Sequence, residues 1–301
     1  MGVLVRFDFA ELPVRGALVR LDQAWLDWWQ RLGLDGVERA MLGEATAALP
    51  LLAANLKFRG RMNLQMQGGA HLSLLVAQID HQLQLRSMLQ TTEGPVPGAW
   101  AQAVAGAQCA VLVDPESGMD RYQAIVEAGG ASLAADIEGY FAQSEQLATR
   151  VWLASDEAVA TGLLVQRLPG DSDDTDGFET VAMLADTLAD GELLATEPDA
   201  LLHRLFSTVG LRQHDTRDVT LTCRCSRERI GTLLLSLGEE DVEALLAEQG
   251  RVEAACEFCG RAYVYEADDA RALFVAAQAE PPSQTNTRDR RPVPSGGNVV
   301  A

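Results

Sequence analysis

Alternating hydrophobic and polar positions dominate the first part of the chain and predict β-strands. One set of apolar residues recurs at every second position: Val3, Val5, Phe7 and Phe9. Residues 62–66, 72–79 and 83–89 repeat the alternation. A period of two is typical of a strand with one buried face. Because Gly68 and Gly69 separate the first two of these segments, we expect a hairpin there, followed by a third neighbouring strand.

A helical spacing of apolar residues interrupts the strands. Asp22 is suited to cap a short helix whose residues 25–29 include three tryptophans, because its carboxylate can accept from unpaired backbone N–H groups. Residues 37–55 form a longer helical pattern. Within it, Pro50 predicts a kink or a break, since proline lacks the N–H donor of a helix interior.

Further strands and one more helix decide the fold class. The strands are expected at residues 109–113, 122–127, 147–154 and 158–167. Ser132 is expected to cap a helix that runs to Ser144. The mixture of consecutive strands and interspersed helices favours an α+β fold over an alternating parallel sheet. We assign residues 1–169 to this strand-rich first domain.

An acidic region at residues 170–222 follows this domain, after a turn-prone boundary at residues 171–177. Ten carboxylates and no Lys or Arg lie between Asp171 and Ala200. Apolar residues nevertheless recur there at helical spacing: Val181, Leu184, Leu188, Leu201, Leu202, Leu205 and Phe206. The pattern predicts amphipathic helices whose acidic face repels itself, so the segment should be marginally stable and depend on docking. An ordinary pair of surface helices fits the pattern equally well.

The last part of the chain combines two helices with a small hairpin. Ser226 is expected to cap the first helix, and the carboxylates at residues 239–241 favour the start of the second. Two short strands are expected at residues 252–256 and 261–265. Because Pro, Ser, Asn, Gly and Arg dominate the end of the chain, we expect residues 276–301 to be a disordered tail.

Four cysteines in this part carry the strongest chemical signal. Cys223-x-Cys225 is followed, after a gap of 30 residues, by Cys256-x-x-Cys259 and Gly260. Two close pairs of soft thiolates are the ligands that Zn²⁺ prefers in a tetrahedral structural site. Gly260 tolerates the positive φ that a tight turn often requires. We therefore predict one zinc ion held by all four cysteines in a small domain at residues 223–275. The alternative is a set of cysteines without metal.

Composition limits the partners and the compartment. The net charge of −19 argues against binding to nucleic acid or to an anionic membrane, because both need a cationic surface. No window approaches the apolar length of a membrane span, and Arg6 and Asp8 interrupt any secretory signal. Five cysteines, four of them in metal-like spacing, fit a reducing compartment better than a secreted disulfide framework. We therefore expect a cytoplasmic protein.

Other candidate residues are better explained by packing. Cys109 lies in an apolar strand pattern, where a buried cysteine is commoner than a nucleophile. The tryptophan cluster and the alternating Met62 and Met66 are expected in the core. The histidines lack the spacing of a second metal site: His71, His81, His203 and His214. Since the sequence also has no glycine-rich phosphate loop and no nucleophile elbow, we predict no catalytic residues and no enzymatic activity.

Several longer motifs surround the cysteines and extend the picture. They are Cys223-Arg-Cys-Ser-Arg-Glu-Arg229, Cys256-Glu-Phe-Cys-Gly260, Leu202-His203-Arg-Leu-Phe206, Tyr140-Phe-Ala-Gln-Ser-Glu-Gln-Leu147 and, more weakly, Arg121-Tyr-Gln-Ala-Ile125. These motifs and their order along the chain resemble those of the redox domain, the linker and the first domain in the heat shock protein 33 family. The members of this family are bacterial, redox-regulated holdase chaperones. The chain departs from the family at Ala148, where proline is expected, and the residues after Ala276 match nothing.

The resemblance implies a holdase that binds unfolding client proteins without ATP under oxidative stress. It implies zinc-bound inactivity, activation through disulfides, dimerisation when oxidised, and transfer of clients to ATP-dependent foldases. Structural zinc contributes on the order of 10–16 kcal/mol to small thiolate domains, and flanking arginines at 224, 227, 229 and 261 are expected to offset the charge of the site. We expect disulfides between neighbours, Cys223–Cys225 and Cys256–Cys259, to replace this cross-link. Residues 170–275 should then unfold while the first domain stays folded.

Two other functions are compatible with the cysteine pattern. A thiol–disulfide oxidoreductase would use the pair Cys256 and Cys259, although the βαβ context of a thioredoxin-like motif is missing. A zinc-containing nucleic-acid-binding protein would use the helices between the cysteine pairs, although the acidic charge opposes it. Turnover of a dithiol substrate and a salt-dependent binding titration would distinguish these alternatives from a chaperone.

Overall fold

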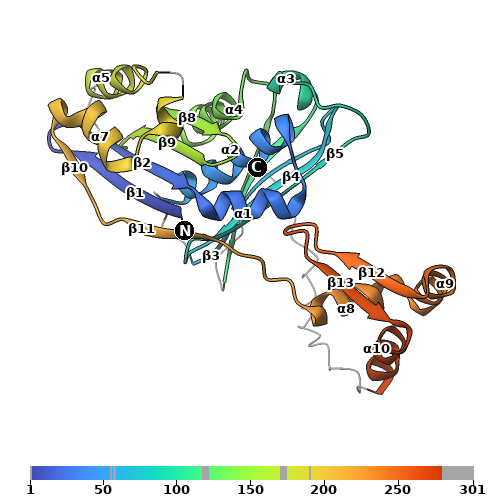
Figure 1. Cartoon of the computed structure of the whole chain (residues 1–301). Coiled ribbons are helices and arrows are strands. Elements are labelled where there is room, and N and C mark those ends of the chain that lie inside the picture. The colour runs from blue at the N-terminus through green and yellow to red at the C-terminus, as the bar shows by residue number, and fades with distance from the viewer. Residues whose placement is uncertain are drawn as a thin grey trace, which may run out of the picture. The chain divides into compact units, whose positions relative to one another are not determined.

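The computed structural model divides into two compact units. The first comprises Met1–Arg224 with Cys256–Arg261, and the second comprises Cys225–Ala255 with Ala262–Ala301 (Figure 1). The structure describes residues 2–54, 56, 59–116, 122–169, 175–189 and 191–279. None of the helices in these ranges is both long and apolar enough to cross a membrane.

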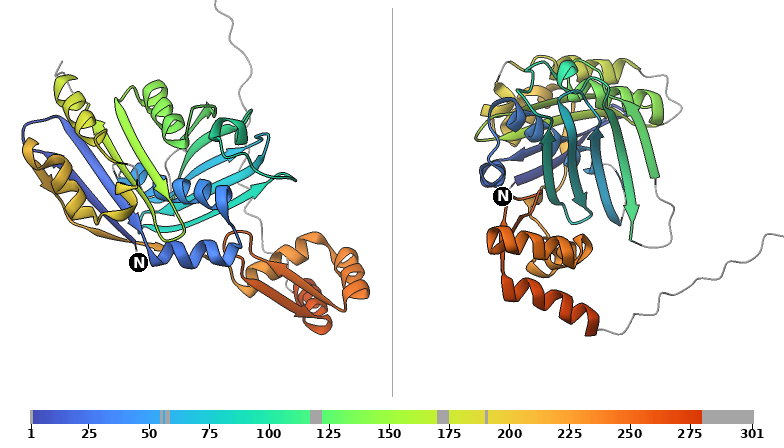
Figure 2. Two further views of the ribbon diagram at one scale, coloured as in Figure 1. Left: turned by 45° about the horizontal axis from the view of Figure 1, so that its top comes forward. Right: turned by 90° about the vertical axis from the view of Figure 1, so that its right-hand side faces the viewer.

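The first unit is built on one curled sheet. Its strands are β1 Gly2–Phe9, β2 Val14–Leu21, β3 Gly60–Gln67, β4 Leu72–Asp80, β5 Gln84–Thr91, β6 Gln108–Pro115, β7 Tyr122–Glu127, β8 Thr149–Ser155, β9 Ala160–Arg167, β10 Leu211–Gln213 and β11 Arg217–Leu221. Within the described residues their order is β7-β6-β3-β4-β5-β11-β1-β2-β9-β8, and β10 also pairs with β1. Figure 2 shows the sheet from two further sides. Neighbouring strands are antiparallel, except that β11 runs parallel to β5. The α+β class and the hairpin of β3 and β4 are confirmed.

Three strands of this sheet were not predicted. β2 is buried along nearly its whole length, so it lacks the alternation that a half-exposed strand would show. β10 and β11 lie in the segment predicted as a helical linker, yet they pair with β1 and β5. They are short, and their partners lie far away in the sequence, so local patterns carry no sign of them.

A central helix forms the core of the first unit. α2 Gly36–Ala54 packs against β4, β5, β8 and β9, and every residue from Met41 to Ala54 except Glu44 is buried. Of the kink or break predicted at Pro50, the break is wrong, because α2 continues through that residue. The shorter helices are α1 Gln23–Leu32, α3 Trp100–Ala103, α4 Leu133–Tyr140 and a π-helix at Phe141–Glu145.

Of the two caps predicted for the shorter helices, one is confirmed and one is wrong. Ser132 caps α4, since its hydroxyl accepts from the backbone N–H of Ala135 at 3.2 Å. Asp22 stands at the N-cap position of α1 but forms no side-chain cap. Its Oδ1 lies 2.8 Å from Nε of Arg20 instead. A buried guanidinium therefore takes the carboxylate that the helix was expected to use.

The predicted amphipathic helices of the acidic region cover one face of the sheet. They are α5 Thr175–Ala185, α6 Glu192–Ala195 and α7 Pro198–Phe206. Their apolar side chains pack with residues of β1, β2 and β9 in one cluster, and Figure 1 shows α5 and α7 beside these strands. Most of the predicted boundary at 171–177 lies outside the described residues.

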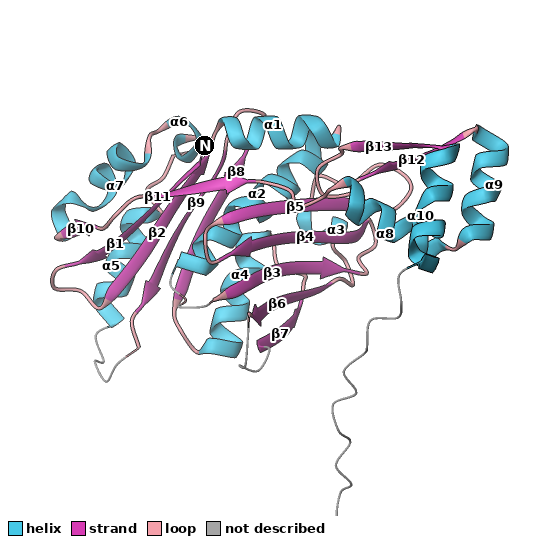
Figure 3. Cartoon of the chain, turned by 90° about the horizontal axis from the view of Figure 1, so that it is seen from below, coloured by secondary structure: helices cyan, strands magenta, loops and turns pink. Residues whose placement is uncertain are grey.

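The second unit has a small core of its own. It contains α8 Arg227–Leu237, α9 Glu239–Gln249, β12 Arg251–Ala255, β13 Ala262–Glu266 and α10 Ala267–Ala279 (Figure 3). The buried residues of this core are Ile230, Leu234, Val242, Leu246, Val252, Tyr265, Ala270 and Phe274. The hairpin and the first two helices were predicted, and Ser226 caps α8 through the N–H of Arg229. α10 was not predicted, and the disorder expected from residue 276 is wrong for residues 276–279, which belong to this helix. The rest of the expected tail lies outside the described residues.

Candidate metal centre

Four cysteine sulfurs converge on one point of the structure. The Sγ atoms of Cys223, Cys225, Cys256 and Cys259 all lie within 4.8 Å of one another, and none of the four is in a disulfide. Four thiolates at about 2.3 Å from a zinc ion define a tetrahedron with edges of about 3.8 Å. The sulfurs of Cys223 and Cys256 are 3.6 Å apart, which matches such an edge. The four residues are thus positioned to hold a metal ion, and their soft donors fit zinc.

A tight turn presents two of these sulfurs. The carbonyl oxygen of Cys256 accepts from the N–H of Cys259 at 3.2 Å and from that of Gly260 at 2.8 Å. Gly260 has a φ of 68°, so the predicted need for glycine in this turn is confirmed. A Cβ at Gly260 would also lie 2.1 Å from the carbonyl oxygen of Arg31. The turn therefore tolerates no side chain at this position.

Pairing of β11 with β5 positions Cys223. Leu221 stands opposite Leu85 in this parallel pair, and the N–H of Thr222 donates to the carbonyl of Leu85 at 2.8 Å. Cys223 follows directly, so the end of the strand fixes where its sulfur lies. Cys225 is placed by a side chain, since the hydroxyl of Tyr263 in β13 donates to its Sγ at 3.1 Å.

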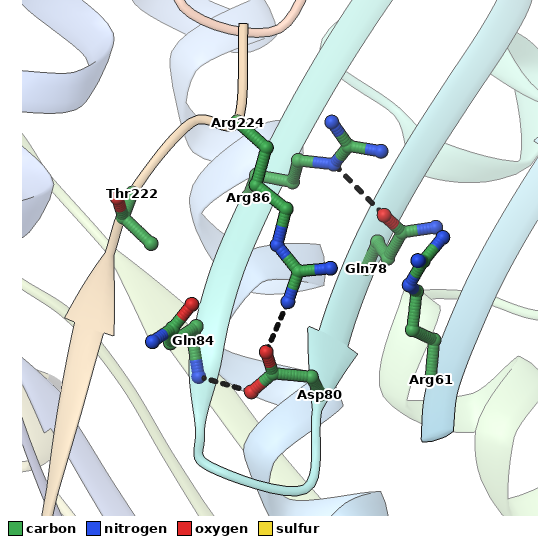
Figure 4. Close-up of a pocket in the computed structure, with 7 residues that line it drawn as sticks. All are labelled: Arg61, Gln78, Asp80, Gln84, Arg86, Thr222 and Arg224. Atoms are coloured by element: carbon green, nitrogen blue, oxygen red, sulfur yellow. Dashed lines mark hydrogen bonds and ion pairs between the residues drawn. The ribbon is translucent and has the colours of Figure 1, made fainter. Parts of the chain in front are cut away.

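Arg224, between the first two cysteines, is anchored on the sheet by Asp80. This carboxylate is 6% exposed, and its Oδ1 accepts from the backbone N–H groups of Gln82 and Gln84, each at 2.9 Å. Its Oδ2 pairs with the guanidinium of Arg224, as Figure 4 shows. One buried carboxylate thus closes the turn between β4 and β5 and also fixes the chain between the two cysteines.

Arg86 on β5 is a second cation beside the cluster. Its Nε donates to Oε1 of Gln78 at 2.8 Å (Figure 4). Its guanidinium carbon lies 4.1 Å from the ring centre of Phe258, within cation–π range. Burial lowers the pKa of Arg86, and attraction and a hydrogen bond to Cys223 partly oppose this shift. Sequence reasoning missed Arg86 because it lies far from the cysteines in the chain.

The other residues considered from the sequence lie elsewhere. Arg227, one of the arginines expected to offset the charge of the site, donates to the carbonyl of Val264 at 2.6 Å and pairs with Asp269 at 2.8 Å. Cys109 is 2% exposed in β6 and is no member of the cluster. No histidine belongs to a metal-binding group in the part of the chain that the structure describes. The core positions predicted for Trp25, Trp28, Met62 and Met66 are confirmed, since all four side chains are fully buried. The third tryptophan of the cluster, Trp29, is only half-buried, so its predicted core position is wrong.

Comparisons with known proteins identify the family. The family model described as Hsp33 protein matches residues 2–266. The chain belongs to the Hsp33 family. A 33 kDa chaperonin of Nitrosococcus oceani is 38% identical over 283 residues, which cover 94% of this chain and 97% of that protein. A 33 kDa chaperonin of Methylobacillus flagellatus is also 38% identical, over 275 residues that cover 90% and 94%.

A solved Hsp33 structure has the same fold. The crystal structure of the 33 kDa chaperonin (heat shock protein 33 homolog) of Thermotoga maritima superposes with a TM-score of 0.79 at 22% identity, over 92% of this chain and 99% of that one. The family resemblance found in the sequence is therefore confirmed. The names of these Hsp33 relatives support a chaperone function for the chain.

Proposed function

We propose that the chain is a redox-activated holdase that binds unfolding proteins without ATP. The observation that carries the proposal is the convergence of four reduced cysteine sulfurs within 4.8 Å. Cys223, Cys225, Cys256 and Cys259 would hold one zinc ion in the reduced chain. When bound, the ion would supply a cross-link worth on the order of 10–16 kcal/mol in domains of this size.

The second unit depends on this cross-link more than the first. Its core contains eight buried side chains among the residues that the structure describes, and domains this small usually need a metal or disulfides to stay folded. Thiolates are also the form of cysteine that oxidants attack. When two thiols form a disulfide, the oxidant takes up two electrons, and both sulfurs are lost as metal ligands. We infer that oxidation of the cluster therefore unfolds the second unit.

The linker, defined as residues 175–206, would transmit this change. It covers apolar residues of the sheet that are at most 2% exposed: Val5, Phe7, Phe9, Val14, Leu18, Leu163 and Val165. Loss of the linker would expose this surface together with the linker's own leucines, and an apolar surface of this kind binds unfolding chains. The net charge of −19 would keep the loaded chaperone soluble.

The remaining parts of the proposal follow from the family resemblance. The oxidised chain would form a homodimer and pass its clients to ATP-dependent foldases in the cytoplasm. No enzymatic step is part of this function, and the acidic chain is not expected to bind nucleic acid or membranes.

Suppression of client aggregation tests the proposal directly. A heat-unfolding client is mixed with the reduced zinc-loaded chain or with the same chain after peroxide treatment, and light scattering is followed. We expect suppression by the oxidised chain only. A Cys109→Ser variant should behave as the wild type does. Equal suppression by the reduced and oxidised chains would contradict redox activation, and none by either would contradict the holdase function.

A further inference from the structure

The surface under the linker makes polar contacts as well as apolar ones. We call this surface the linker face and define it by the apolar residues of β1, β2 and β9 that α5–α7 cover: Val5, Phe7, Phe9, Val14, Leu18, Leu163 and Val165. Apolar side chains alone would accept any apolar segment, because hydrophobic contact has no direction. Two groups of polar contacts at this face further restrict which segments can bind there.

The first polar contact is a buried arginine on β2. Arg20 is 7% exposed, and its Nη1 donates to the carbonyl of Leu194 at 2.7 Å and to that of Thr196 at 3.4 Å. Both carbonyls lie at the C-terminal end of α6, where helices leave acceptors unpaired. Nε of Arg20 also lies 3.8 Å from a carboxylate oxygen of Glu197. Arg20 therefore contacts a helix end and the acidic residue that follows it.

The second polar contact lies on β8. Nη2 of Arg150 is 2.9 Å from Oδ1 of Asp186, and Nε1 of Trp152 donates to the same oxygen at 3.2 Å. Asp186 follows the last residue of α5. Here too, the first unit binds a carboxylate that stands just beyond a helix. The two contacts are made by different strands and bind successive parts of the linker.

We propose that the linker face selects acidic amphipathic helical segments of unfolding proteins, and that Arg20 and Arg150 make the selection. This inference rests on the proposed function, in which oxidation removes the linker from the face. A client helix with an apolar side and a carboxylate after its last turn would restore both contacts. A neutral or basic segment would remove the linker's carboxylate from each guanidinium and leave only the carboxylates of the sheet's own side, Asp22 at 2.8 Å from Arg20 and Glu138 at 3.3 Å from Arg150, which disfavours such an occupant.

Two synthetic peptides test this selectivity on the oxidised full-length chain. One peptide copies residues 175–206, and the other carries Asp186→Asn and Glu197→Gln. Their Kd values are compared by fluorescence anisotropy at low ionic strength. We expect the acidic peptide to bind about tenfold more tightly, since hydrogen bonds to charged groups differ from neutral ones by this order. The difference should shrink as salt is added.

Protein variants show whether the two arginines cause the difference. The double variant Arg20→Met and Arg150→Met should bind both peptides equally. Arg15→Met is the matched control, because Arg15 lies on the same strand as Arg20 but bonds to Gln166 at 2.6 Å and should keep the preference. Arg20→Lys retains the positive charge and should keep part of the preference for the acidic peptide. This single variant tests the proposal if the double variant folds poorly.

The result has clear contrary outcomes. Equal binding of the two peptides by the wild type, an undiminished preference in the double variant, or no binding of either peptide would each overturn the proposal. If the oxidised chain suppresses client aggregation in the same samples, such a result refutes the selectivity and leaves the holdase function standing.

Discussion

The five cysteines fall into two chemical kinds, one lying apart in the core and four lying beside one another. Burial raises the pKa of Cys109 to about 12, so this side chain is a thiol at neutral pH and reacts slowly with oxidants. The four clustered sulfurs lie beside one another and near Arg86, which interacts with Cys223. Thiolates are the form of cysteine that binds metal ions and that oxidants attack. One residue type is thus packed in the core at β6 and positioned to hold a metal ion in the cluster.

Removal of single cysteines should separate these two kinds. Cys109→Ser should retain about one zinc per chain in the reduced protein, because its sulfur lies outside the cluster. Cys256→Ser should lose most of the metal, because three thiolates cannot complete the four-sulfur site. Metal analysis of the purified reduced variants measures both. Loss of zinc from the Cys109 variant, or full retention in the Cys256 variant, would show that the ligands are assigned wrongly.

Glu44 in α2 should make the stability of the first unit depend on pH. Burial raises the pKa of its carboxyl group from 4.5 to about 7. The folded chain therefore keeps a proton that the unfolded chain releases, so stability is complete below pH 4.5 and falls as the pH rises through about 7. The loss is at most about 3 kcal/mol.

A Glu44→Gln variant isolates this contribution. Its free energy of urea unfolding should exceed that of the wild type at pH 8, and the difference should diminish towards pH 5. Tryptophan fluorescence reports on the first unit alone, because all five tryptophans precede residue 153. A difference that does not change with pH would refute the assignment to Glu44.

Among the secondary-structure elements, the helices of the linker are held by docking on the sheet. α7 is attached through a cluster of aromatic rings. The ring centroid of Phe206 lies 5.5 Å from that of Phe7 and 5.4 Å from that of Phe9. Phe206 itself is fully buried. The acidic side chains of the linker meanwhile repel one another, so docking supplies most of its stability.

Truncation of Phe206 should therefore loosen the linker in the reduced chain. Phe206→Ala removes a buried aromatic side chain, a change that typically costs about 3–5 kcal/mol. Hydrogen exchange in residues 175–206 should become faster while zinc stays bound. Met183→Ala is the control, because Met183 on α5 is 68% exposed and should have little effect. Unchanged exchange in the Phe206 variant would mean that docking does not hold the linker.

Oxidation should pair neighbouring cysteines. The Cys256–Cys259 turn already holds its two sulfurs close, and short loops close fastest once the metal is lost. A bridge between Cys225 and Cys256 would instead retain a loop constraint worth about 4 kcal/mol. Peptide mapping under non-reducing conditions should find Cys223–Cys225 and Cys256–Cys259. A dominant bridge between the two pairs would contradict the switch, because the cross-link would survive.

Local patterns in the sequence revealed the elements whose cause is local. The hairpin of β3 and β4 and the cap at Ser226 are set by neighbouring residues, and both were predicted. The spacing of the cysteines likewise predicted that they form a cluster. β11 and the pairing of Asp80 with Arg224 were missed, because each joins segments distant in the sequence. α10 was missed although its buried Ala270 and Phe274 have helical spacing, since the disordered tail was predicted to begin at residue 276, inside the helix.

Across the whole molecule, the two units are expected to differ in stability. The first unit has the larger core, built on a continuous sheet and the buried helix α2, and we expect that core to persist without metal. We propose that the second unit and the linker each depend on one support, the cysteine cluster and the docking surface respectively. Loss of the first support should therefore remove part of the chain and preserve the rest.

Hydrogen exchange before and after peroxide treatment at mildly raised temperature tests this central claim most directly. We predict that exchange becomes fast in residues 175–206 and in the second unit, while β3–β6 and α2 stay protected and client aggregation becomes suppressed. Slow exchange in the linker and the second unit, in a sample that suppresses aggregation, would contradict the account.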